Sequence, residues 1–243
     1  MPQFAPLDQL RATLAGIEPV RFHRRPVMPF GVPDVDAGLV DGGLRLDSLH
    51  EVAGHTPALA DERAATLFVA GIAARTWGPV LWVVRRRDLF APRLDRVGLT
   101  TDRLLLVEAA DDAGLLALME EGLRHRGLGA VVGQPRHAGL AATRRLQLVA
   151  SGGRTIAMLL RRAPQTTVDP FKAASAAATR WRVGHTPPIA MTRGRRRPIW
   201  MLTAAQQEGE PVEAQIAACD RTGRCTPVED NGQRRALIGS AAA

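Results

Sequence analysis

The stretch that decides the fold reads Leu49-His50-Glu51-Val52-Ala53-Gly54-His55-Thr56-Pro57-Ala58-Leu59-Ala60-Asp61-Glu62-Arg63. The apolar residues over 44–52 predict a strand, and the spacing of Ala65, Phe68 and Ile72 predicts a helix over 61–76. A strand, a loop and a helix in this order form the place where an α/β nucleotide-binding fold holds phosphate. The loop between them is therefore the first candidate for a ligand site.

This loop lacks the residues that phosphate binding requires. A phosphate loop needs several glycines, whose N–H groups reach the phosphates, and a lysine followed by Ser or Thr. Here Gly54 is the one glycine and Pro57 removes a donor, while Asp61 and its neighbour place negative charge where the anion would sit. The single lysine of the chain, Lys172, lies 118 residues beyond Gly54.

Two further strands of such a fold would end in acids, and neither does here. The strand expected to carry a magnesium-binding aspartate ends at Gly133, and the strand expected to carry a water-activating acid ends in Arg85-Arg86-Arg87. We predict that the protein hydrolyses no nucleotide, has no catalytic residues and no metal site, and uses no cofactor.

Other catalytic chemistry finds no better support. Ser48 and Ser151 lack the glycines of a nucleophile elbow, and the six histidines show no ligand spacing. Cys219 and Cys225 are the two cysteines, and their spacing suits the facing strands of a hairpin that turns at 222–223. We predict that they are free thiols.

Strand-like and helix-like runs alternate along the middle of the chain. Strands separated by helices of about 10–15 residues predict crossover connections and a parallel sheet. Beyond residue 163 the predicted strands follow one another, which predicts an antiparallel extension. The predicted strands are 44–52, 80–84, 104–107, 130–132, 155–160, 178–183, 199–203 and 212–218, and the predicted helices are 61–76, 89–97, 111–125 and 141–150. The fold class is therefore α/β, with a mostly parallel sheet flanked by helices.

The ends of the chain differ from this core. Residues 1–18 predict an amphipathic helix, because Leu7, Leu10, Leu14 and Ile17 recur at helical spacing. Residues 19–30 carry prolines and arginines and predict a linker, residues 31–228 the domain, and residues 229–243 a flexible tail. No apolar run approaches the roughly 18 residues of a membrane helix, so we expect a cytoplasmic protein without membrane contact.

The positive charge is concentrated in one third of the chain. The formal net charge is +8, yet residues 122–200 hold 15 basic residues and one acid, Asp169. Such a segment is typical of a polyanion partner, although an arginine-rich proteome would also place arginine on solvated faces. The candidate nucleic-acid-binding residues are Arg161, Arg162, Arg180, Arg182, Arg195, Arg196 and Arg197.

Two tryptophans of this segment are candidates for base stacking, Trp181 and Trp200. On a strand, Trp181 would face away from Arg180 and Arg182, so we expect it in the core. The sequence leaves open whether the arginines meet single-stranded DNA or an acidic protein.

Several segments together resemble a known family. Phe30-Gly31-Val32-Pro33-Asp34-Val35-Asp36-Ala37-Gly38-Leu39, then Gly42-Gly43-Leu44 and Leu49–Gly54, resemble the lead-in to the phosphate loop of RecA-type recombinases. Ala178-Thr179-Arg180-Trp181-Arg182-Val183 resembles the strand after their second DNA-binding loop. With the Arg195–Trp200 segment and a lost ATP site, the chain resembles the ImuA family over roughly residues 5–228.

The resemblance implies a RecA-like domain without Walker A and B motifs and a role in the bacterial SOS response. ImuA-type proteins act with an ImuB-like polymerase homologue and an error-prone replicative-type DNA polymerase in translesion synthesis, and contact with RecA is also implied. SulA-type proteins, which are related, block cell division. We therefore expect a non-catalytic adaptor, with a DNA-binding module and a division inhibitor as the alternatives.

The resemblance also implies where partners would bind. The recombinase DNA loops correspond to residues 134–137 and 161–170, which keep their charge but lack the glycines. The N-terminal helix of a recombinase packs on a neighbour, so the apolar face of residues 1–18 is the candidate partner-binding site. The alternative is that this face folds back on the chain's own sheet.

Overall fold

The computed structural model describes residues 26–86, 91–151, 153–162, 169–186 and 197–228. The predicted N-terminal helix, most of the predicted linker and the predicted tail lie outside these residues. Of the linker, residues 26–30 are described: they include strand β1 (Val27–Met28), and Phe30 packs in the core.

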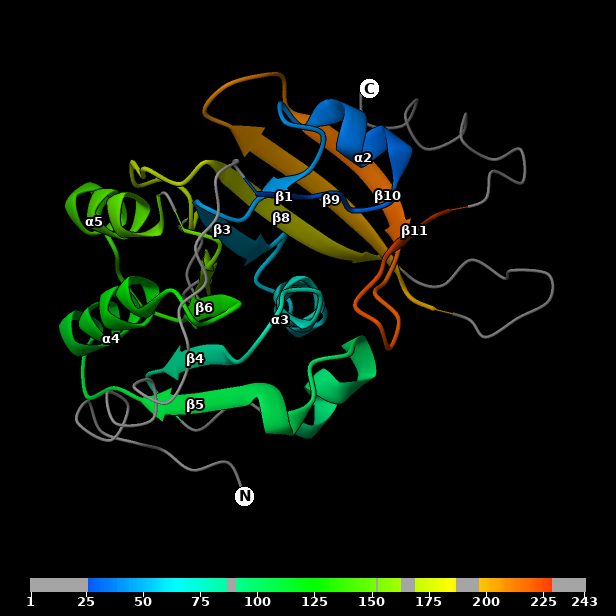
Figure 1. Ribbon diagram of the computed structural model, residues 1–243. Coiled ribbons are helices and arrows are strands. Elements are labelled where there is room, and N and C mark those ends of the chain that lie inside the picture. The colour runs from blue at the N-terminus through cyan, green and yellow to red at the C-terminus, as the bar shows by residue number, and fades with distance from the viewer. Residues whose placement is uncertain (1–25, 87–90, 152, 163–168, 187–196, 229–243) are drawn as a thin grey trace.

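A nine-stranded sheet runs through the molecule (Figure 1), in the order β11-β10-β9-β8-β3-β7-β6-β4-β5. The pairs among β3, β4, β5, β6, β7 and β8 are parallel, and β9, β10 and β11 extend the sheet in antiparallel fashion. This confirms the predicted fold class. The strands of this sheet are β3 (Leu49–Gly54), β4 (Val80–Val84), β5 (Leu104–Glu108), β6 (Ala130–Gly133), β7 (Ile156–Arg161), β8 (Thr179–Thr186), β9 (Ile199–Gln206), β10 (Val212–Ala217) and β11 (Thr226–Pro227).

Helices cover both faces of the parallel half of the sheet. On one face, α4 (Asp112–His125) and α5 (Leu140–Ala150) pack on side chains such as Leu81, Val131 and Leu159. On the other face lie α3 (Leu59–Ala74) and the 3-10 helix η1 (Ala91–Val97), while the short α2 (Pro33–Gly38) packs near β10. A second 3-10 helix, η2 (Thr101–Arg103), leads into β5.

The side of the sheet that faces α3 contains an aromatic cluster. Phe30, Phe68 and Trp181 lie with ring centroids 5.3–5.8 Å apart, and Trp200 meets Phe68 edge-on at 6.0 Å. Trp181 and Trp200 are both buried. The expectation that Trp181 is a core residue is confirmed, and neither ring is accessible to a base.

The predicted strand over 44–52 is two strands, β2 (Leu44–Arg45), which pairs with β1, and β3. A turn at 46–48 separates them, because Asp47 accepts hydrogen bonds from the Arg45 and Ser48 side chains and so stabilises local structure over an extended chain. Of the predicted helix at 89–97, residues 91–97 form η1 rather than an α-helix.

The predicted hairpin carries both cysteines at its turn. Cys219 and Cys225 are free and buried, with their Sγ atoms 2.9 Å apart, and the turn between them has Gly223 at φ 74°. Among the described residues, no helix is long and apolar enough to cross a bilayer.

Candidate functional site

The β3–α3 loop is the position at which a related fold would hold phosphate. Here Asp61, in the first turn of α3, turns its carboxylate back into the loop. Its Oδ2 accepts hydrogen bonds from the N–H of Thr56 at 2.9 Å and from the Thr56 hydroxyl at 2.6 Å. Its Oδ1 accepts from the N–H of His185, at 2.7 Å, near the end of β8. The chain's own carboxylate thus occupies donors that a phosphate would need.

The end of β6 is equally closed. A Cβ added at Gly133 would press on the Met119 sulfur and lie 3.0 Å from a Leu115 methyl group, both in α4. An aspartate side chain at this position would therefore require the Met119 side chain to move. At the end of β4, Arg85 forms an ion pair with Asp112, 3.6 Å away, at the start of α4. Arg87 lies outside the described residues.

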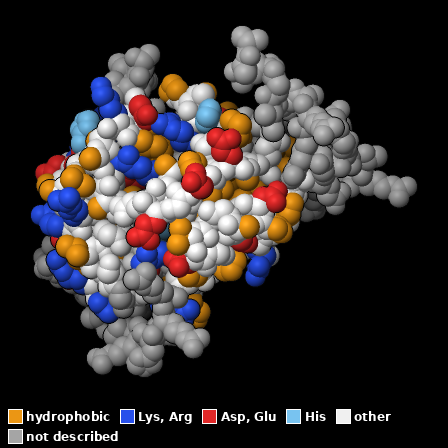
Figure 2. All heavy atoms as spheres, turned by 90° about the horizontal axis from the view of Figure 1, so that it is seen from above, with side chains coloured by type: hydrophobic (Ala, Val, Ile, Leu, Met, Phe, Trp, Pro, Cys, Tyr) orange, Lys and Arg blue, Asp and Glu red, His pale blue; other side chains and the backbone are white. Residues whose placement is uncertain are grey.

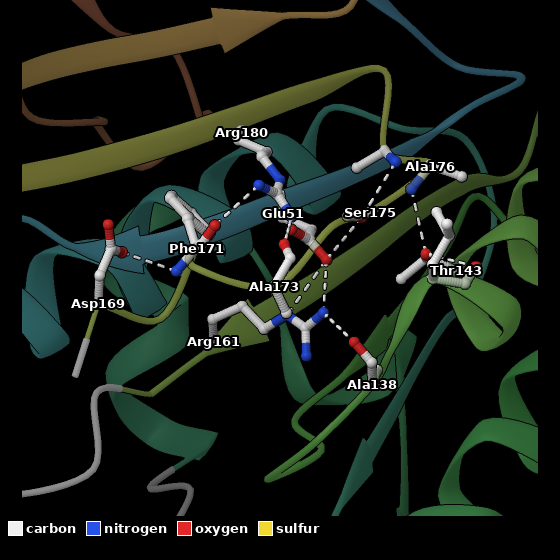
Figure 3. A network of polar contacts seen from close by, with 12 residues as sticks. Glu51, Ala138, Thr143, Arg161, Asp169, Phe171, Ala173, Ser175, Ala176 and Arg180 are labelled. Atoms are coloured by element: carbon white, nitrogen blue, oxygen red, sulfur yellow. Dashed lines mark hydrogen bonds and ion pairs between the residues drawn. The ribbon is translucent and has the colours of Figure 1, made fainter.

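A buried ion-pair network joins the middle of β3 to the end of β7 and the start of β8 (Figure 3). Glu51, which is fully buried, holds the Arg161 guanidinium with Oε1, 2.6 Å from Nη2 and 3.2 Å from Nε. Its Oε2 forms an ion pair with Arg180 Nε at 3.0 Å. The Ser175 hydroxyl donates to Oε1 as well, at 3.0 Å. One carboxylate therefore joins β3, β7, β8 and the segment before β8.

The arginines of this network also fasten the segment at 169–178 to the sheet. Arg180 donates to the carbonyl oxygens of Phe171 at 3.0 Å and Ala173 at 2.5 Å, and Arg161 donates to that of Ala138 at 2.7 Å. The N–H of Ala176 donates to Thr143 in α5. These contacts give the segment a fixed path over the sheet.

The network borders a shallow cavity of about 290 Å³ on β8, β9 and β10. Arg180, Arg182 and Phe171 line it, together with Thr203 and Glu213. The Phe171 ring lies beneath both guanidinium groups, 5.4 Å and 5.0 Å from their central carbons. This cavity combines positive charge with an aromatic ring.

Asp169 neutralises part of that charge, since its Oδ1 lies 2.5 Å from Arg182 Nη2. Although partial burial acts in the opposite direction, the Phe171 N–H and the Arg182 guanidinium hold the pKa of Asp169 below its ordinary value. Asp169 is half exposed, so an external anion can compete with it for Arg182.

The predicted nucleic-acid-binding residues have different roles in the structure. Arg161 and Arg180 form ion pairs with Glu51, and Arg182 forms an ion pair with Asp169. Arg197 donates to the Ala218 carbonyl and to the Thr226 hydroxyl, so it fastens the C-terminal hairpin. Arg162 is exposed. The predicted residues that lie outside the described residues are Arg195 and Arg196, and Leu7, Leu10, Leu14 and Ile17 of the N-terminal helix.

Further arginines, absent from the predicted set, gather along one side of the molecule. In Figure 2, which views the molecule from above, Lys and Arg side chains gather along the left margin, the side on which α4 and α5 lie in Figure 1. On α4, α5 and their connections the exposed arginines are Arg124, Arg126, Arg136, Arg144, Arg145 and Arg154. Arg124 and Arg145 share Glu120, at 3.3 Å and 3.0 Å. Within the described ranges, no three His, Cys, Asp or Glu residues gather as metal ligands.

Comparison with known proteins decides the family. The chain is 37% identical to Protein ImuA of Caulobacter vibrioides strain NA1000 over 172 residues, which cover 67% of this chain and 70% of that protein. The chain belongs to the ImuA family. Protein ImuA of a second Caulobacter vibrioides strain, ATCC 19089, matches equally. No protein-family profile matches this ImuA-family chain.

A solved structure is also similar in part. SulA from Pseudomonas aeruginosa is 24% identical with a TM-score of 0.37, and the match covers 46% of the ImuA-family chain and 97% of that protein.

Sequence reasoning missed the network around Glu51. The signal was present, because a glutamate inside a buried strand requires a cationic partner. Its partners, however, lie 110 and 129 residues further along the chain.

Proposed function

We propose that this protein is a non-catalytic adaptor of SOS-induced translesion DNA synthesis, which acts by binding an ImuB-like polymerase homologue and RecA, together with an error-prone replicative-type DNA polymerase. Membership of the ImuA family supports a role in SOS-induced mutagenesis. The observation that carries the adaptor part is the Asp61 carboxylate, which takes the loop donors that a nucleotide phosphate would need.

The role in mutagenesis is tested in cells. A strain that lacks the gene is exposed to ultraviolet light, and the frequency of induced mutants is measured with and without the native gene on a plasmid. We expect the induced frequency to fall several-fold on deletion and to return with the native gene. An unchanged frequency would remove the proposal.

The absence of nucleotide chemistry is tested with the purified full-length chain. We expect no heat of ATP binding in isothermal titration calorimetry with magnesium and no release of phosphate. If the native chain hydrolyses ATP and Asp61→Asn changes the rate, the protein is a residual ATPase and the non-catalytic adaptor hypothesis is wrong.

The partner-binding part of the proposal includes the N-terminal helix at 1–18. Deleting residues 1–26 should weaken association with the ImuB-like protein or RecA while the domain keeps its melting temperature. Unchanged association would remove the docking role of Leu7, Leu10, Leu14 and Ile17.

A second candidate function is binding of single-stranded DNA at the Phe171 cavity. The favouring observation is the pair of guanidinium groups over Phe171, one of which is held by a half-exposed carboxylate. Binding of a labelled oligonucleotide should weaken with salt, with a log–log slope of about −0.7 per phosphate contacted. Arg182→Gln should reduce both affinity and slope, whereas binding that is independent of salt would exclude this function.

A further inference from the structure

Trp77 stands out because it is 77% exposed, whereas Trp82, Trp181 and Trp200 are buried. It follows the end of α3 and precedes β4. Single exposed apolar residues are common on protein surfaces, so exposure alone does not mark Trp77 as an interaction site. What distinguishes Trp77 is that the protein holds the backbone around it in place.

One arginine fixes the backbone on both sides of Trp77. Arg103 donates to the carbonyl of Thr76 at 2.6 Å and to that of Gly78 at 2.7 Å from Nη2, and Nη1 donates to Ala74 at 2.7 Å. The carbonyl groups before and after Trp77 thus share one guanidinium group. Gly78 adds a φ of 84°, which turns the chain immediately after the indole. Presenting Trp77 on a preorganised turn lowers the entropic cost of binding.

Two neighbouring segments bring positive charge to the same end of the sheet. The N–H of Gly129 donates to the Pro79 carbonyl at 2.9 Å, and the Thr155 hydroxyl donates to the Leu128 carbonyl at 2.7 Å. Residues 75–79, 126–129 and 153–155 therefore adjoin one another. The exposed arginines of the latter two segments are Arg126 and Arg154.

Arg126 has an unusual backbone. Its φ of 55° lies in the left-handed region, and it is the one described non-glycine residue with a positive φ. Glycine is the usual residue at such a helix end, and Gly127 follows immediately. A costly conformation at an exposed arginine is the kind of outlier that points to a function.

We propose that Trp77 is the anchor of a protein-docking surface, with Arg126 and Arg154 as its charged rim. The partner presents an apolar pocket bordered by carboxylates. Tryptophan and arginine are the residues that most often dominate protein interfaces. A base-stacking platform would need one indole face packed on the protein, whereas the exposure of Trp77 means that the ring projects, and a projecting ring fits a pocket in a partner.

The surface is separate from the sites described above. Trp77, Arg126 and Arg154 precede the parallel strands β4, β6 and β7, whereas the Asp61 loop follows the carboxyl end of β3. The amino and carboxyl ends of parallel strands lie on opposite sides of a sheet. The Phe171 cavity lies on β8, β9 and β10, which β3 and β7 separate from β6 and β4. The surface therefore leaves the Asp61 loop and the Phe171 cavity accessible while a partner is bound. It deepens the proposed function and rests on it.

The test measures binding of the full-length chain to the purified ImuB-like protein of the same genome by calorimetry. Trp77→Ala should weaken binding about tenfold or more, as expected for an anchor. The double variant R126E/R154E should weaken it and abolish its salt dependence. The matched control is Leu148→Ala, which removes another exposed apolar side chain, 73% exposed, on α5. It should bind within twofold of the native chain.

Different results would contradict the docking surface and the adaptor function. If the native chain binds the ImuB-like protein and Trp77→Ala binds it with an affinity within twofold, the docking surface is wrong and the adaptor function stands. No binding by the native chain overturns the adaptor and the surface with it. If Trp77→Ala instead abolishes binding of a single-stranded oligonucleotide and spares the ImuB-like protein, the surface belongs to nucleic acid and the inference is wrong. Equal melting temperatures of native and variant chains support a direct effect of Trp77 on binding.

Discussion

Asp61 holds the backbone of His185 at 2.7 Å, although 124 residues separate them in the chain. The contact ties the first turn of α3 to the end of β8, and the same carboxylate binds Thr56 in the loop between β3 and α3. A structural hydrogen-bond acceptor thus stands where a nucleotide-binding relative would need an empty, positively polarised loop.

Asp61→Ala should destabilise the fold by about 2–3 kcal/mol, because it leaves the N–H groups of Thr56 and His185 without their acceptor. Asp61→Asn keeps one oxygen acceptor and should cost less. Urea unfolding followed by circular dichroism measures both. A loss below about 0.5 kcal/mol for Asp61→Ala would show that water replaces the carboxylate without cost.

Glu51→Gln should cost about 3–5 kcal/mol, since it leaves the buried Arg161 guanidinium without a counter-charge. The double variant E51L/R161L should lose less than the sum of the single variants, because it removes both buried charges. Unfolding in urea gives the double-mutant cycle.

The matched control for Glu51 is Asp169→Asn, which breaks the more exposed ion pair with Arg182. It should cost at most about 1 kcal/mol. Equal losses for Glu51→Gln and Asp169→Asn would contradict the structural role assigned to the buried network.

His50 should make stability depend on pH. Its imidazole is buried between the Thr179 hydroxyl, 2.7 Å from Nδ1, and the Arg45 carbonyl, 2.7 Å from Nε2. The Trp181 indole N–H also donates to the Thr179 hydroxyl oxygen, which leaves the hydroxyl proton able to bond Nδ1 of a neutral ring. Burial lowers the pKa of His50 from 6.5 to about 4.

The depressed pKa of His50 makes the folded protein less stable in acid. The unfolded chain binds the proton more tightly, so the contribution of His50 is complete above pH 6.5 and is lost as the pH falls from 6.5 towards 4. The full loss is about 3 kcal/mol. Because carboxylates also titrate in this range, the measurement is the difference between the native chain and His50→Gln at pH 7.5, 5.5 and 4.5. As the pH falls, the free energy of unfolding should decrease less for His50→Gln than for the native chain. Equal decreases would show that protonation of the buried ring does not destabilise the fold.

Local patterns predicted most elements well, for physical reasons that individual residues show. Val80–Val84 is buried along its whole length, so a continuous apolar run marked the strand. Trp181 was predictable as core, because strand alternation separates it from the arginines on either side. In contrast, the partners of Glu51 and Asp61 come from strand order, which no local pattern contains. The turn that carries Trp77 is held by Arg103, 26 residues further along the chain, and no local pattern contains that contact.

Cys219 and Cys225 should resist alkylation in the folded protein. The contact between the two thiols, together with burial, raises the pKa of Cys219 well above its ordinary value, and the thiolate is the reactive form. At pH 8, iodoacetamide should label the native chain at least tenfold more slowly than the urea-unfolded chain, as followed by mass spectrometry. The comparison variant is Gly71→Ala, because a Cβ at position 71 would lie 2.5 Å from the Cys219 sulfur and displace the hairpin from α3. That variant should be labelled faster than the native chain. Native labelling as fast as that of the unfolded chain would mean that the hairpin does not shield its thiols in solution.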